Sequence, residues 1–141
     1  ARGADAFREQ WAGRVRRARS AGMEVVGLER LLRRHGDRAE QVLDLVATDP
    51  ELAAPLHAEG RVIRAEAVIA ARDEGARTLG DILIRRTRLA VQTRDRAQSA
   101  ARDTAELVAP ILGWDDTRIA AEIAGLLAEQ PAVPPHRPPE A

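Results

Sequence analysis

Apolar residues recur at intervals of three and four along most of the chain, and this helical period restricts the fold more than any other feature. The period is clearest over residues 7–18, 25–32 and 119–127. No segment alternates polar and apolar residues in the manner of a half-buried strand. The sequence therefore predicts an all-α fold, a single-domain bundle of about five to seven helices.

The core of this bundle has to be built almost without aromatic residues, which supply only 2% of the 141 residues. Alanine, leucine, valine and isoleucine must do the packing instead. Because alanine is small and favours helix, the composition predicts helices that approach one another closely.

Capping residues and glycines divide the chain into helices. Gly22, Gly36 and Gly113 stand where helices are expected to end, and a change of direction is expected near 75–78. A central helix is predicted over 62–76, and Pro110 should kink or shorten the helix that contains it. The predicted helix-starting residues are Asp5, Asp37 (with Glu40), Thr78 (with Asp81), Thr93 or Asp95, and Asp115.

Charge and residue usage exclude several functions. Twenty-two basic and 22 acidic residues give a net charge of zero, which argues against binding of nucleic acid by the whole domain. The sequence contains no lysine, so Schiff-base and phosphate-loop lysine chemistry is excluded. It also contains no cysteine, which excludes disulfides and fits a cytoplasmic location. No apolar run approaches the length of a membrane-spanning helix, about 20 residues.

The sequence predicts neither catalytic nor metal-ligating residues. Its three histidines lie in separate segments without ligand spacing, and Ser20 and Ser99 lack the setting of a nucleophile. His35 is expected to place favourable charge at a helix C-terminus. His57 and His136 are expected to be solvated.

The stretch ILIRRTRLAV (82–91) contains three arginines within an apolar run. On a helical wheel Arg86 falls in the middle of the apolar sector, which predicts that it is buried and paired with an acid. Arg85 lies at the edge, four residues after Asp81, and is expected to form a surface pair with it. Arg88 lies on a flank that the wheel does not assign.

The preceding helix supplies the candidate partners for Arg86. The wheel places Glu66, Asp73 and Arg77 along the border of its apolar stripe. We expect Arg86 to pair with Glu66 or Asp73 between the two helices, so that the set forms a structural ion pair. The alternative interpretation is that the arginines form an exposed ligand site.

A second basic cluster, RVRRAR (14–19), lies in the first predicted helix. Because the chain has no net charge, a solvated face is the favoured interpretation. The segment LERLLRRHGDRAEQVLDL also suggests two helices around a glycine turn. The alternative function is therefore a freestanding helical binding module, similar to a helix-turn-helix, with a nucleic acid or a protein as partner.

Four blocks carry a resemblance to a known family: LLRRHGDRAEQVLDL, PELAAPL, AEAVIAARDEGARTLGDILIRRTRLAV and LGWDDTRIAAEI. In order and spacing they resemble the C-terminal helical domain of FAD-dependent, respiratory glycerol-3-phosphate dehydrogenases. His35 stands where this family commonly has tyrosine. The resemblance implies three regions: a connecting helix over 1–22, the C-terminal helical domain over 23–130, and a flexible Pro-rich tail over 131–141.

The resemblance also implies a function for the whole enzyme, called here the parent. Such a parent oxidises sn-glycerol 3-phosphate to dihydroxyacetone phosphate on FAD and passes electrons to quinone, or to oxygen in related oxidases. FAD and substrate would be held by an N-terminal portion, and the present domain would bind no cofactor and be inactive alone. It would pack against the flavin and substrate domains, with no nucleic-acid partner. The parent is expected in the cytoplasm or peripherally on the inner face of the cytoplasmic membrane, and a homodimer is left open.

Overall fold

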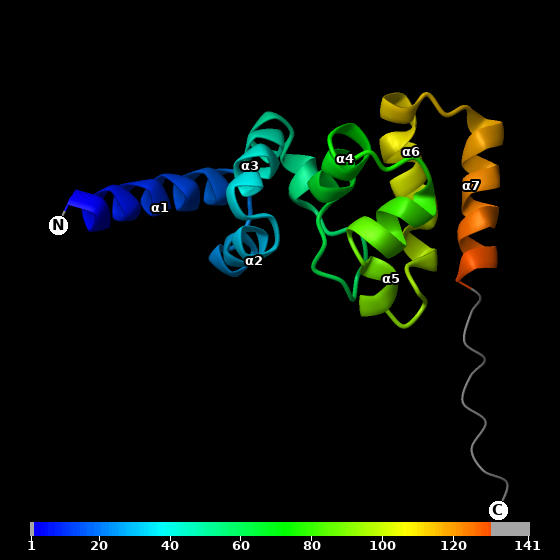
Figure 1. Cartoon of the computed structure of the whole chain (residues 1–141), viewed down its shortest axis with the longest axis horizontal. Helices are drawn as coiled ribbons and strands as arrows, with labels where there is room; N and C mark the ends of the chain where they lie inside the picture. Colours follow the sequence, from blue (N-terminus) through cyan, green and yellow to red (C-terminus); the bar gives the residue numbers. More distant parts are fainter. Residues whose placement is uncertain (1, 131–141) are drawn as a thin grey trace, which may run out of the picture.

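A short central helix, α4 (Arg64–Arg72), organises the fold in the computed structural model, which describes residues 2–130. Every residue from Ala65 to Ala71 is buried, as expected for a helix covered on all sides. Helices α1 to α3 lie on one side of α4, and α5 to α7 lie on the other (Figure 1). All regular structure within 2–130 is helical, so the predicted all-α, single-domain fold is confirmed.

The N-terminal side consists of α1 (Arg2–Ser20), α2 (Val25–His35) and α3 (Ala39–Thr48), followed by the short 3₁₀ helix η2 (Pro50–Ala53). Only the second half of α1 packs against its neighbours, and its first half extends away from the body (Figure 1). Leucine, valine and isoleucine dominate the core between these helices and α4. Its largest fully buried side chains are Leu28, Leu31, Val42, Leu43, Val46 and Ile69.

The C-terminal side consists of a π-helical turn η3 (Asp81–Arg86), α5 (Leu89–Gln92), α6 (Ala101–Leu112) and α7 (Asp116–Glu129). Alanine supplies more than half of its buried core residues. Among the helices of residues 2–130, α4 and α6 form the most extensive contact, in line with the close approach that the alanine content predicts. Within residues 2–130 no helix combines the length and the apolar character needed to cross a bilayer.

Most of the predicted helix ends are confirmed. Gly22, Gly36 and Gly113 have φ values of 78°, 55° and 71°, the left-handed region that glycine adopts at low cost. The side chain of Asp115 accepts a hydrogen bond from the Arg118 N–H and so caps α7. The Thr78–Asp81 pair forms the reciprocal hydrogen bonds of a capping box.

Other predicted boundaries are wrong. In one case the expected capping side chain pairs with a distant helix, and in the others the helix begins or ends at a different residue. Helix α1 begins at Arg2, so Asp5 lies inside it. Asp37 forms no cap, and its expected partner Glu40 accepts hydrogen bonds from arginines of α1. Helix α6 begins only at Ala101, and it continues through Pro110 to Leu112. Helix α4 is shorter than the predicted 62–76.

The segment around the three arginines departs from α-helical geometry. The N–H and the hydroxyl of Thr87 both donate to the carbonyl oxygen of Ile82, at 2.8 and 2.7 Å. This i to i+5 spacing is that of a π-turn, which is wider than an α-helical turn. After Ile82 and Leu83 the next buried residue is therefore Thr87, and Arg86 is exposed.

The three predicted regions relate differently to the structure. The second half of α1 shares a core with α2 and α3, through Ala18 and through Trp11 and Val15, which pack against it. The role of residues 1–22 as a connection to a preceding portion stays a prediction. The predicted Pro-rich tail, 131–141, lies outside the described residues.

Candidate interaction site

A buried carboxylate, that of Glu66, lies where α2 meets the first turn of α4. Only 2% of Glu66 is exposed to solvent. One of its oxygens, Oε2, accepts a hydrogen bond of 2.8 Å from the N–H of Ile63, the residue that precedes α4. A carboxylate at this position satisfies a free helix N–H and interacts favourably with the helix dipole.

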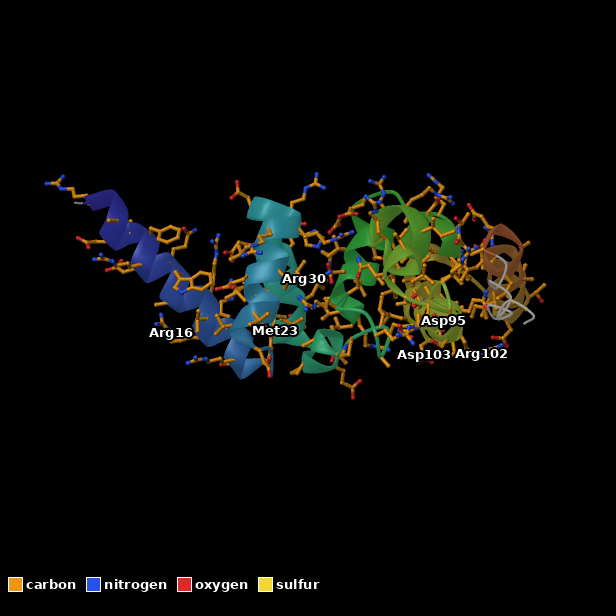
Figure 2. The ribbon with its side chains drawn as sticks, turned by 90° about the horizontal axis from the view of Figure 1, so that it is seen from below. Arg16, Met23, Arg30, Asp95, Arg102 and Asp103 are labelled. Atoms are coloured by element: carbon orange, nitrogen blue, oxygen red, sulfur yellow. The ribbon has the colours of Figure 1, made fainter. Side chains whose placement is uncertain are left out.

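The side-chain partners of Glu66 within residues 2–130 come from the last turns of α2. Arg30 donates two hydrogen bonds to the carboxylate, at 3.0 and 3.1 Å. The Nε2 atom of His35 lies 2.9 Å from Glu66 Oε1. The Nε atom of Arg34 is 3.6 Å from the same oxygen. The fork of Arg30 thus makes the bidentate contact that arginine favours with a carboxylate, and Figure 2 shows Arg30 on the side of α2 that faces α4.

These contacts determine the ionisation of Glu66. Burial by itself raises the pKa of this carboxyl, because the charged form loses hydration. Hydrogen bonds from His35 and Arg30, and the charge of Arg30, outweigh that effect. The pKa of Glu66 is therefore lowered below its ordinary value, and the group is a carboxylate at neutral pH.

The predicted pairing of Arg86 with Glu66 or Asp73 is wrong. The guanidinium of Arg86 is exposed because of the π-turn, and within residues 2–130 no carboxylate lies at ion-pair distance from it. The connection between this arginine block and Glu66 runs through the backbone instead. Arg34 donates a hydrogen bond to the carbonyl oxygen of Arg86 and reaches Glu66 with its Nε atom.

The remaining predicted residues do not gather into one site. Asp73 is exposed and pairs with its neighbour Arg72 at 2.9 Å. The backbone N–H of Arg77 donates to Asp81, while its side chain is exposed. Two arginines complete the set. Arg85 pairs with Asp81 at 2.8 Å, as expected, and also with Glu129 at 2.6 Å, and Arg88 is exposed with a φ of 58°.

Sequence reasoning missed Arg30 and Arg34 as partners of Glu66. They lie four residues apart in α2, so they share one face, and His35 follows directly. That spacing indicates a basic face on α2. It does not indicate which distant acid pairs with this face.

His57 is also placed differently from the expectation, because it is buried rather than solvated. Its Nε2 atom lies 2.8 Å from Asp95 Oδ1, and its Nδ1 atom accepts a hydrogen bond of 2.9 Å from the N–H of Glu59. Burial by itself raises the pKa of Asp95, but hydrogen bonds from Ser99 and His57 outweigh it and lower the pKa to about 2. The pair joins the loop before α4 to the loop before α6.

The basic cluster of α1 is only partly a solvated face. Arg14 and Arg17 pair with Glu40, and Arg17 also pairs with Asp44, so they tie α1 to α3. Arg16 and Arg19 are exposed, as expected.

An open groove of about 350 Å³ runs beside α2, above the Glu66 cluster. We call it the arginine groove. Its lining residues are Val26, Glu29, Arg30, Arg33, Arg34, Arg61 and Gln92. Guanidinium groups in such a setting bind carboxylates and phosphates. Among the described residues no group of three histidine or acidic side chains is placed to hold a metal ion.

Comparison with known proteins assigns this helical domain to a family. Residues 2–119 match the C-terminal domain of alpha-glycerophosphate oxidase, so the chain belongs to this family. The match includes residues 2–22, which the sequence analysis assigned to a connecting helix. The predicted relationship to glycerol-3-phosphate dehydrogenases is likewise confirmed.

Curated relatives agree with the family match. The chain is 38% identical over 107 residues to glycerol-3-phosphate dehydrogenase 2 of Mycobacterium bovis and of Mycobacterium tuberculosis. It is 37% identical over 103 residues to glycerol-3-phosphate dehydrogenase of Mycobacterium leprae. The alignments cover 76% and 73% of this chain but only 18% of each relative. No solved structure was found that matches the chain.

Proposed function

We propose that the chain is the non-catalytic C-terminal helical domain of an FAD-dependent glycerol-3-phosphate dehydrogenase. The parent oxidises sn-glycerol 3-phosphate to dihydroxyacetone phosphate and passes the electrons to quinone. The observation that carries this proposal is the family match over residues 2–119, together with relatives named for that activity.

FAD and substrate are assigned to a part of the parent other than these 141 residues. The sequence has no Gly-rich turn after a strand, the element that holds a dinucleotide pyrophosphate in Rossmann-type domains. Bound FAD would supply the capacity to accept a hydride equivalent from the substrate. The role of this domain is to pack against the portion that binds FAD and substrate.

An uncovered apolar residue on α1 supports the packing role. The apolar stripe of α1 runs through Phe7, Trp11 and Val15. Trp11 and Val15 pack on the N-terminal core, but Phe7 is 64% exposed. Contact of Phe7 with the rest of the parent would complete the cover of this stripe.

The proposal is tested by expressing the complete reading frame that contains this sequence. We expect a yellow flavoprotein that reduces a soluble quinone analogue when sn-glycerol 3-phosphate is added. The same assay with oxygen as acceptor distinguishes a dehydrogenase from an oxidase. A reading frame without a dinucleotide-binding portion, or a flavoprotein inert toward this substrate, would contradict the proposal.

The 141-residue chain alone serves as the matched comparison. We expect it to retain no FAD through gel filtration and to show no turnover. A gel-shift assay with unrelated DNA at physiological salt tests the alternative binding module, and we expect no shift. Cell fractionation of the parent tests the proposed location, in the cytoplasm or peripherally on the inner face of the cytoplasmic membrane.

A further inference from the structure

The arginine groove carries more positive charge than the acids beside it can neutralise. Four of its lining residues are arginines, and Glu29 is its one lining acid. Glu66 lies beneath the groove and contributes one further negative charge. A second depression adjoins the groove, shares Val26, Arg30 and Arg61 with it, and adds one acid, Glu24, so that four arginines still face only three acids. This surplus is local, since the whole chain has no net charge.

Two of the four arginines have no charged partner within the described residues. Arg33 and Arg61 are exposed and make no ion pair with any residue of 2–130. Arg30 and Arg34 are instead held from below, by Glu66 and by the carbonyl oxygen of Arg86. The floor of the groove is thus fixed before any ligand arrives, which reduces the entropy cost of binding.

An apolar group lies beside this charge. Val26 lines both the groove and the adjoining depression and is 62% exposed. Arginine is enriched at protein interfaces relative to the rest of the surface. A free phosphate would use the arginines but would leave Val26 exposed to water.

We infer that the arginine groove is the docking site for a carboxylate-bearing surface of the parent's remaining polypeptide. This inference rests on the proposed function. The alignments cover only 18% of each relative, so a parent of that size has ample polypeptide to supply the partner surface. Charge complementarity selects an acidic surface, and Val26 selects one with an apolar group at the matching position.

The test uses the full-length parent and the double variant Arg33→Glu/Arg61→Glu. Both side chains are exposed and unpaired within 2–130, so the substitution leaves the fold of this domain intact. We expect amides of residues 25–35 to exchange with solvent at least about tenfold faster than in the unmodified protein, because docking no longer protects them. A peptide of the partner surface should become less protected in parallel.

The control is Arg77→Glu/Arg102→Glu, which reverses two exposed arginines elsewhere. Arg102 pairs with Glu106 at 3.5 Å on the surface of α6, a contact whose loss costs little. Figure 2 places Arg102 on the far side of α4 from Arg30. We expect exchange over 25–35 to stay unchanged in this control. The milder variant Arg33→Gln/Arg61→Gln should give an intermediate increase in exchange. This variant and far-ultraviolet circular dichroism show whether faster exchange in the charge-reversed protein comes from misfolding.

Two results would overturn the inference. One is equal protection of residues 25–35 in the groove variant and the unmodified parent. The other is that the unmodified parent binds vesicles containing phosphatidylglycerol, that the groove variant does not, and that exchange without vesicles is the same in both. The occupant of the groove would then be a membrane. The activity assay on the complete reading frame separates these failures from failure of the proposed function.

Discussion

The two sides of α4 are held to it by different kinds of contact. On the N-terminal side a buried carboxylate, Glu66, gathers charged groups from α2, and arginines of α1 pair with acids of α3. On the C-terminal side small alanine side chains let α4 and α6 pack closely, and the pair that includes a buried group there, His57–Asp95, has a partly exposed carboxylate. Packing of small residues follows from local sequence pattern. Ion pairs between helices depend on which distant residues meet.

The largest loss of stability should come from removing the carboxylate of Glu66, which joins α2 to α4. Glu66→Ala leaves Arg30 and the Ile63 N–H without their partner, and we expect a loss of about 3 kcal/mol in unfolding free energy. Urea unfolding of the 141-residue chain measures it. The exposed Asp73→Ala serves as control and should cost less than about 0.5 kcal/mol. Equal effects of the two would remove the special role given to the buried carboxylate.

A close approach on the C-terminal side should give the next largest effect. A β-carbon on Gly60 would collide with Cδ1 of Leu89, which is fully buried. Gly60→Ala is therefore expected to cost about 2 kcal/mol by overpacking. Gly125→Ala, in an open position of α7, should instead stabilise by about 0.5 kcal/mol. Thermal unfolding of both variants compares them, and a stabilised Gly60 variant would contradict the tight packing.

A buried hydroxyl on the C-terminal side offers a stabilising change. Thr104 in α6 is fully buried, and its Oγ1 has no hydrogen-bond partner among the described residues. Thr104→Val should raise the unfolding free energy by about 1 kcal/mol, because an unsatisfied polar group is removed. Thr87→Val should lower it by a similar amount, since that hydroxyl donates to Ile82. If both variants changed the unfolding free energy in the same direction, the contrast between an unsatisfied and a satisfied hydroxyl would be wrong.

The hydrogen bonds that Asp95 accepts from Ser99 and His57 should show themselves mainly through pH. They outweigh the effect of burial and lower the pKa of Asp95 to about 2, below the ordinary value of 3.8. Their contribution to the free energy of unfolding is therefore complete above about pH 4 and is lost as the pH falls through about 2. Between pH 5 and 2, urea unfolding should show a smaller loss of unfolding free energy for Asp95→Asn than for the unmodified chain. Parallel pH profiles would exclude a contribution from the ionised Asp95.

The smallest effect is expected at Arg86. Its side chain is exposed, and the carbonyl oxygen that accepts from Arg34 is unchanged by substitution. Arg86→Met should change the melting temperature of the 141-residue chain by only the equivalent of about 0.5 kcal/mol. A large destabilisation would instead support the buried ion pair that the helical wheel predicted.

These cases show which parts of the structure the sequence could predict. The all-α fold, the glycine-terminated helix ends and the Thr78–Asp81 cap follow from local periodicity and backbone preference, which are read within a few residues. The exposure of Arg86 could not be predicted, because a single π-turn changes which residues face the core. The candidate site was predicted least well. Glu66 was named, but its partners in α2 lie about 30 residues away, and helical spacing does not choose between distant faces.

The burial of α4 from Ala65 to Ala71 has a consequence for how the molecule unfolds. This helix has only nine residues, and it separates the two apolar clusters while contributing side chains to both. If either cluster opened, one flank of α4 would lose its cover, and so short a helix has little intrinsic stability in water. Both clusters should therefore melt together in one cooperative transition, although each is built by its own kind of contact.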